Sequence, residues 1–234
     1  MVAPKSLLTL LSVLAIFVAG ASSAVVSKAQ AQWYISGNVG GAVLVDSDAT
    51  DSSGASSTTS EIRFDAGYAA AGAVGYTFQA PWGAFRLEEE ISYRSNNLDT
   101  VNISSTTGGS LIFSSLGTFA LGGKVSTLGF MTNGWFDFNT GSKWVPFIGG
   151  GVGGANIDLD ITSVGGTATI FNQSDTVLAV QLGTGIGYRV NAKSTLSLAY
   201  RIFGTMDPKF RNGAETIEGE YMNHSIMAGV AIKF

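Results

Sequence analysis

The last eleven residues, His224 to Phe234, alternate between apolar and small or polar side chains. The face that ends in Phe234 also carries Ile226, Ala228, Val230 and Ile232. Successive side chains of a strand point to opposite sides of a sheet, so this segment is predicted to be a strand with one continuous apolar face. Such a strand suits the lipid-facing wall of a transmembrane β-barrel. Soluble sheets contain similar strands, and the rest of the chain has to decide between the two.

The amino-terminal residues have the three parts of a secretory signal peptide. Lys5 precedes an uncharged apolar run at residues 7–18, and two small-residue triplets follow, at 22–24 and 29–31. The run is shorter than the roughly 20 apolar residues of a membrane-spanning helix. We favour cleavage after Ala31, because Trp33 then opens the first strand pattern. The predicted organisation is a signal peptide at residues 1–31 and one barrel domain at residues 32–234.

Composition narrows the class of protein further. Only 13% of the residues are charged, against about 25% in ordinary soluble domains. The net charge of −4 and the lack of a basic cluster argue against a nucleic-acid partner. The absence of cysteine excludes a disulfide scaffold, a thiolate metal site and a cysteine nucleophile. We expect no cofactor and no metal.

Eight alternating segments follow the predicted cleavage site. They are residues 33–45, 62–78, 83–94, 118–138, 143–160, 175–190, 194–205 and 224–234. Most of them exceed the roughly 9–11 residues with which a tilted strand crosses a bilayer. In the second segment we expect Phe64 and Tyr68 to share the outer face. In the fifth segment the alternation is lost after Gly154.

Short and long connections alternate between these segments. The short ones lie around Pro81, at residues 139–142 and at residues 191–193, and the long polar ones lie at residues 46–61, 95–117, 161–174 and 206–220. This order predicts an all-β, eight-stranded, antiparallel up-and-down transmembrane β-barrel with both ends at the short-turn side. Membrane backbone has to satisfy its own hydrogen bonds, so the sheet should close. A closed eight-stranded barrel is filled by side chains rather than by a wide pore.

Charged residues fall on the face that should point into this barrel. In the third segment Arg86, Glu88, Glu90 and Arg94 lie opposite Phe85, Leu87, Ile91 and Tyr93. Arg189 and Arg201 lie opposite the apolar faces of the sixth and seventh segments. Opposite charges can pair along one strand and between strands. The lumen is therefore predicted to hold a charge network of Arg86, Glu88, Glu90, Arg94, Arg189 and Arg201.

Three features fit this pattern poorly or imitate other sites. Glu89 points toward lipid by strict alternation, which a bulge or an interfacial depth would relieve. Gly149, Gly151 and Gly154 match the spacing of a dinucleotide-binding loop, but no helix starts on them. His224 is the only histidine; it falls on the outer face, and no serine stands two residues away to share a proton with it.

The combined pattern resembles the small porin-family outer-membrane β-barrels, the OmpA/OmpX-like group that includes bacterial surface antigens. The matching segments are residues 33–40, 75–78, 85–88, 91–94, 133–137, 145–149 and 185–189, together with the final strand. The resemblance covers residues 33–234. It implies a location in the bacterial outer membrane and a role for Phe234 as an assembly signal read by the outer-membrane assembly machinery.

The expected function is a non-catalytic outer-membrane protein that exposes four polar loops for envelope structure, antigenicity or adhesion. The alternative is a narrow ion-conducting pore gated by the lumenal charges. Two further hypotheses are an outer-membrane lipid-modifying enzyme and a soluble lipocalin-like carrier. Expected partners are outer-membrane lipid, the assembly machinery and a surface ligand held by the loops, and we expect a monomer.

Overall fold

The computed structural model describes residues 32–53, 56–107, 116–212 and 215–234. The predicted signal peptide, residues 1–31, lies outside the described residues. No helix in this described part of the chain is long and apolar enough to cross a membrane. The described residues form twelve strands: β1 (Gln32–Leu44), β2 (Ser47–Ser53), β3 (Ser56–Phe64), β4 (Gly67–Ala80), β5 (Gly83–Thr107), β6 (Gly117–Phe138), β7 (Trp144–Val164), β8 (Thr167–Arg189), β9 (Ser194–Thr205), β10 (Lys209–Asn212), β11 (Glu215–Gly219) and β12 (Met222–Lys233).

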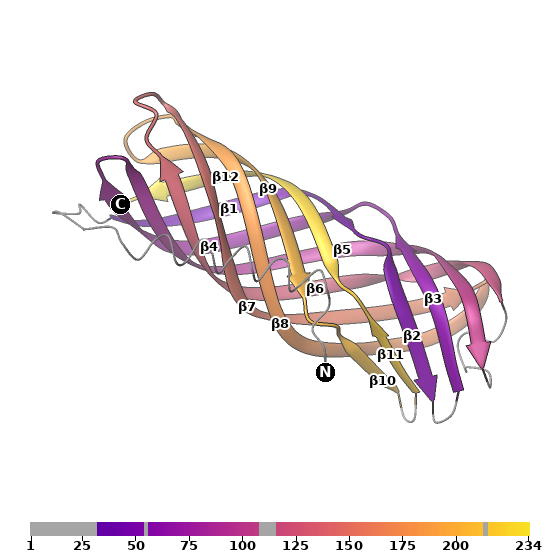
Figure 1. Cartoon of the computed structure of the whole chain (residues 1–234). Coiled ribbons are helices and arrows are strands. Elements are labelled where there is room, and N and C mark those ends of the chain that lie inside the picture. Colours follow the sequence, from indigo (N-terminus) through magenta and orange to yellow (C-terminus); the bar gives the residue numbers. More distant parts are fainter. Residues whose placement is uncertain (1–31, 54–55, 108–115, 213–214) are drawn as a thin grey trace.

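Eight of these strands close into a ring, which confirms the predicted barrel. Its order is β1, β4, β5, β6, β7, β8, β9 and β12, after which β12 pairs with β1 again. Neighbouring strands are antiparallel and follow one another along the chain, apart from the segments that leave the ring (Figure 1). Tyr34 pairs with Lys233, so the first and last strands meet at the end with the short turns.

The four connections predicted as long polar loops are mostly strand, so that prediction was wrong. The hairpins β2–β3 and β10–β11 form a sheet in the order β10, β11, β2, β3, β5, and β5 to β8 run on beside it (Figure 1). We call β2, β3, β10, β11 and the adjoining ends of β5 to β8 the extension. The barrel therefore continues as hydrogen-bonded β-structure on the side opposite the short turns.

A reversal of polarity explains why alternation failed to reveal the extension. In the barrel half of β5 most buried residues are polar or charged, as at Glu88, Glu90 and Ser92. Beyond an irregularity in the strand between Asn97 and Thr100, the buried residues are Val101 and Ile103. A β-bulge shifts the alternation by one residue, so the apolar side chains beyond it turn inward.

The same effect moves Phe64, which the sequence predicted beside Tyr68 on the outer face. The register shifts between Arg63 and Phe64, and Phe64 packs against the apolar cluster inside the extension. Tyr68 remains 56% exposed.

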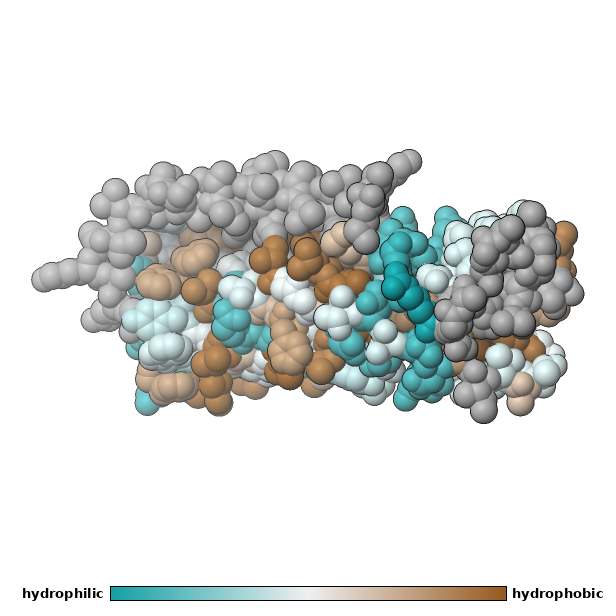
Figure 2. Space-filling view, turned by 90° about the horizontal axis from the view of Figure 1, so that it is seen from below, coloured by the Kyte–Doolittle hydropathy of each residue, from teal (hydrophilic) through white to brown (hydrophobic). Residues whose placement is uncertain are grey.

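The outer surface changes from apolar to polar along the molecule. Figure 2 shows hydrophobic side chains over the barrel and a hydrophilic band where the extension begins. Aromatic rings mark both limits of the apolar part: Trp33–Tyr76, Trp82–Phe136 and Trp144–Tyr188 toward the short turns, and Tyr68–Tyr93 toward the extension. Such paired girdles are typical of a barrel that spans a bilayer.

Candidate functional site

The inside of the barrel is filled by side chains in three layers. The vestibule, at the short-turn end, is lined among others by Arg86, Glu88, Asp137, Arg189 and Lys233. The middle layer consists of Glu90, Asn133, Trp135, Gln181 and Arg201, and each of them is buried. The outer core is the apolar cluster that includes Leu44, Ile62, Val101, Ile157, Phe171, Phe203 and Phe210.

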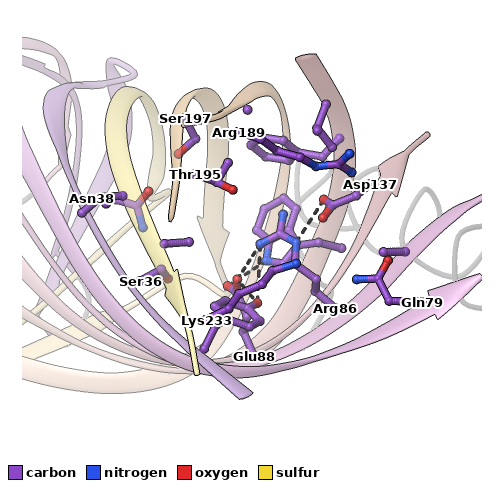
Figure 3. A pocket seen from close by; sticks show the side chains of 18 of the residues that line it. Ser36, Asn38, Gln79, Arg86, Glu88, Asp137, Arg189, Thr195, Ser197 and Lys233 are labelled. Carbon is purple, nitrogen blue, oxygen red and sulfur yellow. Dashed lines mark hydrogen bonds and ion pairs between the residues drawn. The ribbon is translucent and has the colours of Figure 1, made fainter. Parts of the chain in front are cut away.

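Arg86 lies between two carboxylates in the vestibule (Figure 3). Its Nε donates to Asp137 Oδ1 at 3.0 Å, and its Nη1 donates to Glu88 Oε1 at 2.8 Å. Glu88 also accepts from the Tyr34 hydroxyl and, at 2.9 Å, from Trp135 Nε1. Three donors thus satisfy one buried carboxylate, which offsets the cost of removing its charge from water.

A second ion pair closes the middle layer. Arg201 Nη1 donates to Glu90 Oε2 at 2.6 Å, and the two side chains are 5% and 0% exposed. Gln181 Nε2 donates to Glu90 Oε1 at 3.2 Å and to Asn133 Oδ1 at 2.6 Å. The Trp135 ring lies beneath the Arg201 guanidinium, whose Cζ is 5.2 Å from the ring centroid.

Glycines on neighbouring strands make room for Trp135, which is 1% exposed. A Cβ at Gly149 would lie 2.6 Å from Trp135 Cε3, and a Cβ at Gly183 would lie 3.0 Å from Trp135 Cη2. The glycine run of β7 is therefore a strand that lets an indole fill the lumen, as the lack of a following helix led us to expect.

Arg94 and Phe203 form the boundary between the polar layers and the outer core. Arg94 Nη1 donates to Ser92 Oγ at 2.9 Å, and its Cζ lies 4.0 Å from the centroid of the Phe203 ring. No carboxylate of the described residues lies within 4.0 Å of this guanidinium. Phe203 is fully buried and meets Tyr221 edge to face at 6.2 Å between centroids.

The structure thus brings most of the predicted lumenal charges together, but in separate groups. Arg86 pairs with Glu88, Arg201 pairs with Glu90, and Arg94 stacks on an aromatic ring. Arg189 is exposed at the mouth of the vestibule. Phe234 is 67% exposed, and its backbone N–H donates to the Trp33 carbonyl at 3.1 Å. The assembly role of Phe234 stays a prediction.

Sequence reasoning missed the uncharged partners and one acid of these groups. They are Tyr34, Asn133, Trp135, Asp137 and Gln181. Asn133, Trp135 and Asp137 share the inward alternation of β6, and that signal could have found them. Tyr34 and Gln181 also fall on the inward alternation of β1 and β8, but alternation alone does not show which distant strand they face.

Glu89 points to the apolar outer surface, as strict alternation predicted. It stands four residues from Phe85 and four from Tyr93, midway between the aromatic limits on β5. Thr132 Oγ1 lies 2.9 and 3.0 Å from its two carboxylate oxygens. The predicted bulge is therefore not what relieves the cost of this carboxyl group. Instead, the Thr132 hydroxyl on the neighbouring strand hydrogen-bonds to it.

Replacing Glu89 with glutamine is expected to stabilise the barrel by about 1 kcal/mol in lipid, because a charge on the lipid face of a barrel is costly. The amide keeps a hydrogen-bond partner for Thr132. The measurement is urea unfolding from phospholipid vesicles at neutral pH. A loss of stability would mean that this position does not contact hydrocarbon.

Asp207 lies in the extension between β9 and β10, and its environment raises the pKa of its carboxyl group. Burial is the largest cause, and the neighbouring carboxylates of Glu220 and Glu218 add to it, while Lys209 opposes it. A raised pKa in the folded state means that the ionised group destabilises the fold at neutral pH, and protonation relieves this as the pH falls. We expect Asp207→Asn to raise the melting temperature at pH 7 and to leave it unchanged at pH 3. An equal gain at both pH values would contradict this explanation.

His224 lies on the outer wall and contacts an aromatic residue. Its Nδ1 is 2.6 Å from the Tyr200 hydroxyl, and the two rings stack at 5.9 Å between centroids. The neighbouring Ser225 is buried on the inner face. This arrangement suits the interface of a membrane, and among the described residues no serine hydrogen-bonds to the imidazole.

Comparison with known proteins places this geometry in a family. The family described as "Outer membrane protein beta-barrel domain" matches residues 10–234. A protein of Rickettsia conorii named as a candidate adhesin is 26% identical, over 89% of this chain and 85% of its own. The outer membrane protein OprG from Pseudomonas aeruginosa is similar in structure, with a TM-score of 0.51, 16% identity, and coverage of 90% of this chain and 99% of its own. Neisserial surface protein A gives a TM-score of 0.48 at 16% identity, over 86% and 97% of the two chains.

Proposed function

The chain belongs to the outer membrane protein beta-barrel domain family and lies in the bacterial outer membrane, and from that premise we propose that it is a non-catalytic surface protein whose extension mediates adhesion. In such barrels the short turns face the periplasm and the longer segments face the outside. The extension then stands above the membrane, and the vestibule opens toward the periplasm.

One observation carries the proposal: side chains block the lumen, whereas the extension is an ordered, hydrogen-bonded sheet. Arg201, Glu90 and Trp135 block the middle of the barrel, and the outer core fills its extracellular part. The extension, by comparison, is held in a fixed shape by paired hairpins. We infer that such a barrel offers a binding surface outside the cell and does not form a channel for solutes.

The chemistry of the extension supports recognition of another surface. Its outward side chains on β2, β3 and β5 are polar, as at Ser52, Thr59 and Asn102. Its apolar residues pack in its interior and stabilise its shape. The polar outer face is therefore available for binding. The relative named as a candidate adhesin in Rickettsia conorii agrees with this proposal.

Attachment of whole bacteria tests the proposal. A non-adherent bacterium that carries the full chain in its outer membrane should attach to cultured mammalian cells at least tenfold more often than the same strain without it. In a shortened variant, Asn-Gly turns replace residues 49–60 and 210–217 beyond the pairs Asp48–Glu61 and Lys209–Glu218. This variant should lose the gain while keeping heat-modifiable migration on a gel. Equal attachment by both variants would refute adhesion through these hairpins.

The alternative function, an ion pore, requires an open polar lumen, and the apolar outer core argues against it. Ions need a continuous polar path, and the polar layers end at Phe203. We expect planar bilayers with the full chain to show no steady conductance, and Arg86→Gln to leave them silent. Conductance that Arg86→Gln alters would favour the pore.

The enzyme and carrier readings have less support. The surroundings of His224 favour a structural role, and lipid A from cells carrying His224→Ala should be unchanged. A soluble carrier does not fit membership of an outer-membrane family.

A further inference from the structure

We propose that the vestibule is a binding site for a small phosphate-type oxyanion at the periplasmic mouth of the barrel. Adhesion through the extension does not require this site, and the two can fail separately. An enclosed space, the distribution of charge around it, and polar side chains left without partners support this site.

The space is a cavity of about 80 Å³ inside the ring at its short-turn end. A buried water needs about 10–15 Å³ by the same kind of measure, so the cavity holds several waters or one oxyanion of a few heavy atoms. Its inner end is closed by Trp135 and Arg201, both of which line it. A ligand therefore enters and leaves from the periplasmic side.

Charge is distributed unevenly around the cavity. On one wall, Arg86 of β5 faces two carboxylates, Glu88 and Asp137 of β6, so this group keeps one negative charge. Arg201 is neutralised by Glu90. Arg189 of β8 and Lys233 of β12 line the same cavity, and neither has a carboxylate within 4.0 Å among the described residues. Arg189 and Lys233 therefore outweigh the remaining negative charge of the Arg86 group, and the cavity keeps a surplus of one positive charge for an anion.

Polar groups without partners gather on the same wall as these cations. Ser36 and Asn38 of β1, and Thr195 and Ser197 of β9, line the cavity, and none of their side chains hydrogen-bonds to another described residue. The Ser36 hydroxyl is buried without a partner. Strands β1, β12, β9 and β8 are consecutive in the ring, so these hydroxyl, amide and cationic donors belong to one continuous part of its wall.

This donor set fits a phosphate group better than a carboxylate or a halide. Phosphate offers three or four acceptor oxygens in a compact tetrahedron, and arginine binds two of them at once. Asp137 limits the surplus of positive charge, so we expect reversible, micromolar to millimolar binding. The group could be free inorganic phosphate or the headgroup of a phospholipid in the inner leaflet, which surrounds the mouth.

Calorimetric titration of the full chain, folded in a maltoside detergent without phosphate, tests the site. Inorganic phosphate should bind at one saturable site. The double variant Arg189→Gln and Lys233→Gln should weaken binding at least tenfold, and Thr195→Val should weaken it about threefold. Lys143→Gln is the matched control, because Lys143 lies at the same end but outside the lumen, against the Tyr188 ring, and it should bind as the original chain does.

A second titration with a short-chain phosphatidylglycerol separates the two sources. Competition between this lipid and phosphate would show that a headgroup reaches the site, and binding of phosphate alone would assign it to the free ion. No saturable binding of either, or equal weakening by Lys143→Gln, would overturn the proposal. Heat-modifiable migration of each variant shows that the barrel is folded, so a loss of binding cannot be attributed to misfolding.

Discussion

Replacing Glu90 with leucine should lower the free energy of unfolding by about 3–5 kcal/mol, since removing one partner of a buried ion pair leaves the other charge uncompensated. Arg201 would lose its 2.6 Å contact, and Gln181 would lose an acceptor. Both groups are buried in the middle layer, where water reaches them poorly. Urea unfolding of the barrel in phospholipid vesicles measures the effect.

A double variant provides the control for this prediction. Glu90→Leu combined with Arg201→Met removes both charges and keeps side chains of similar length, and it should recover most of the lost stability. A loss below about 1 kcal/mol in the single variant would contradict a dry middle layer. It would mean instead that water fills the lumen around Arg201.

Phe203→Ala should lower the free energy of unfolding by about 3–5 kcal/mol, the usual cost of a large cavity in a packed core. Phe203 is fully buried, and its ring lies against the Arg94 guanidinium on one side and meets Tyr221 on the other. The substitution also leaves a buried cation without its aromatic neighbour. The measurement is the same unfolding titration.

Phe130→Ala is the matched control for Phe203→Ala. Phe130 also lies in a barrel strand, but its side chain is 56% exposed on the outer wall. Lipid can fill the space that this ring leaves, so we expect a clearly smaller loss. Equal losses at the two positions would mean that the outer core contributes no more to stability than the lipid-facing wall does.

Alternation predicted the barrel because lipid imposes one rule on every spanning strand. The outer residues must be apolar, and a small closed lumen accepts the opposite face. Ile226, Val230 and Ile232 are exposed while Ser225 and Met227 are buried, as the final strand indicated. The short turns were equally plain: Asn191 Oδ1 accepts from the backbone N–H groups of Lys193 and Ser194, the local bonding that favours asparagine in turns.

The strands of the extension could not be predicted from outward-facing apolar residues, because the extension is surrounded by water rather than lipid. There the polar face points outward and the apolar face points inward, and a change of alternation in β5 separates the two patterns. Serine- and threonine-rich composition then resembles a loop. The available signals were the apolar alternation of Val101 and Ile103, and the single apolar residues Phe210 and Ile217 that stand between polar neighbours on β10 and β11.

The candidate site was predicted in its residue types but not in its pairs. Alternation placed Arg86, Glu90 and Arg201 inside, because it reports the direction of each side chain. Their partners depend on the register between strands far apart in sequence: Glu90 and Arg201 stand 111 residues apart. Register follows from packing of the whole ring, which no single segment contains.

Cysteine labelling on intact cells tests the central claim, a barrel with its extension at the cell surface and its vestibule in the periplasm. The chain has no cysteine, so single variants carry a single label. A membrane-impermeant maleimide should react rapidly with Asn102→Cys in the extension, and should react with Leu87→Cys on the lipid face and Arg189→Cys at the vestibule only after the cells are broken and detergent is added. Rapid labelling of Arg189→Cys on intact cells, with Asn102→Cys protected, would contradict the account.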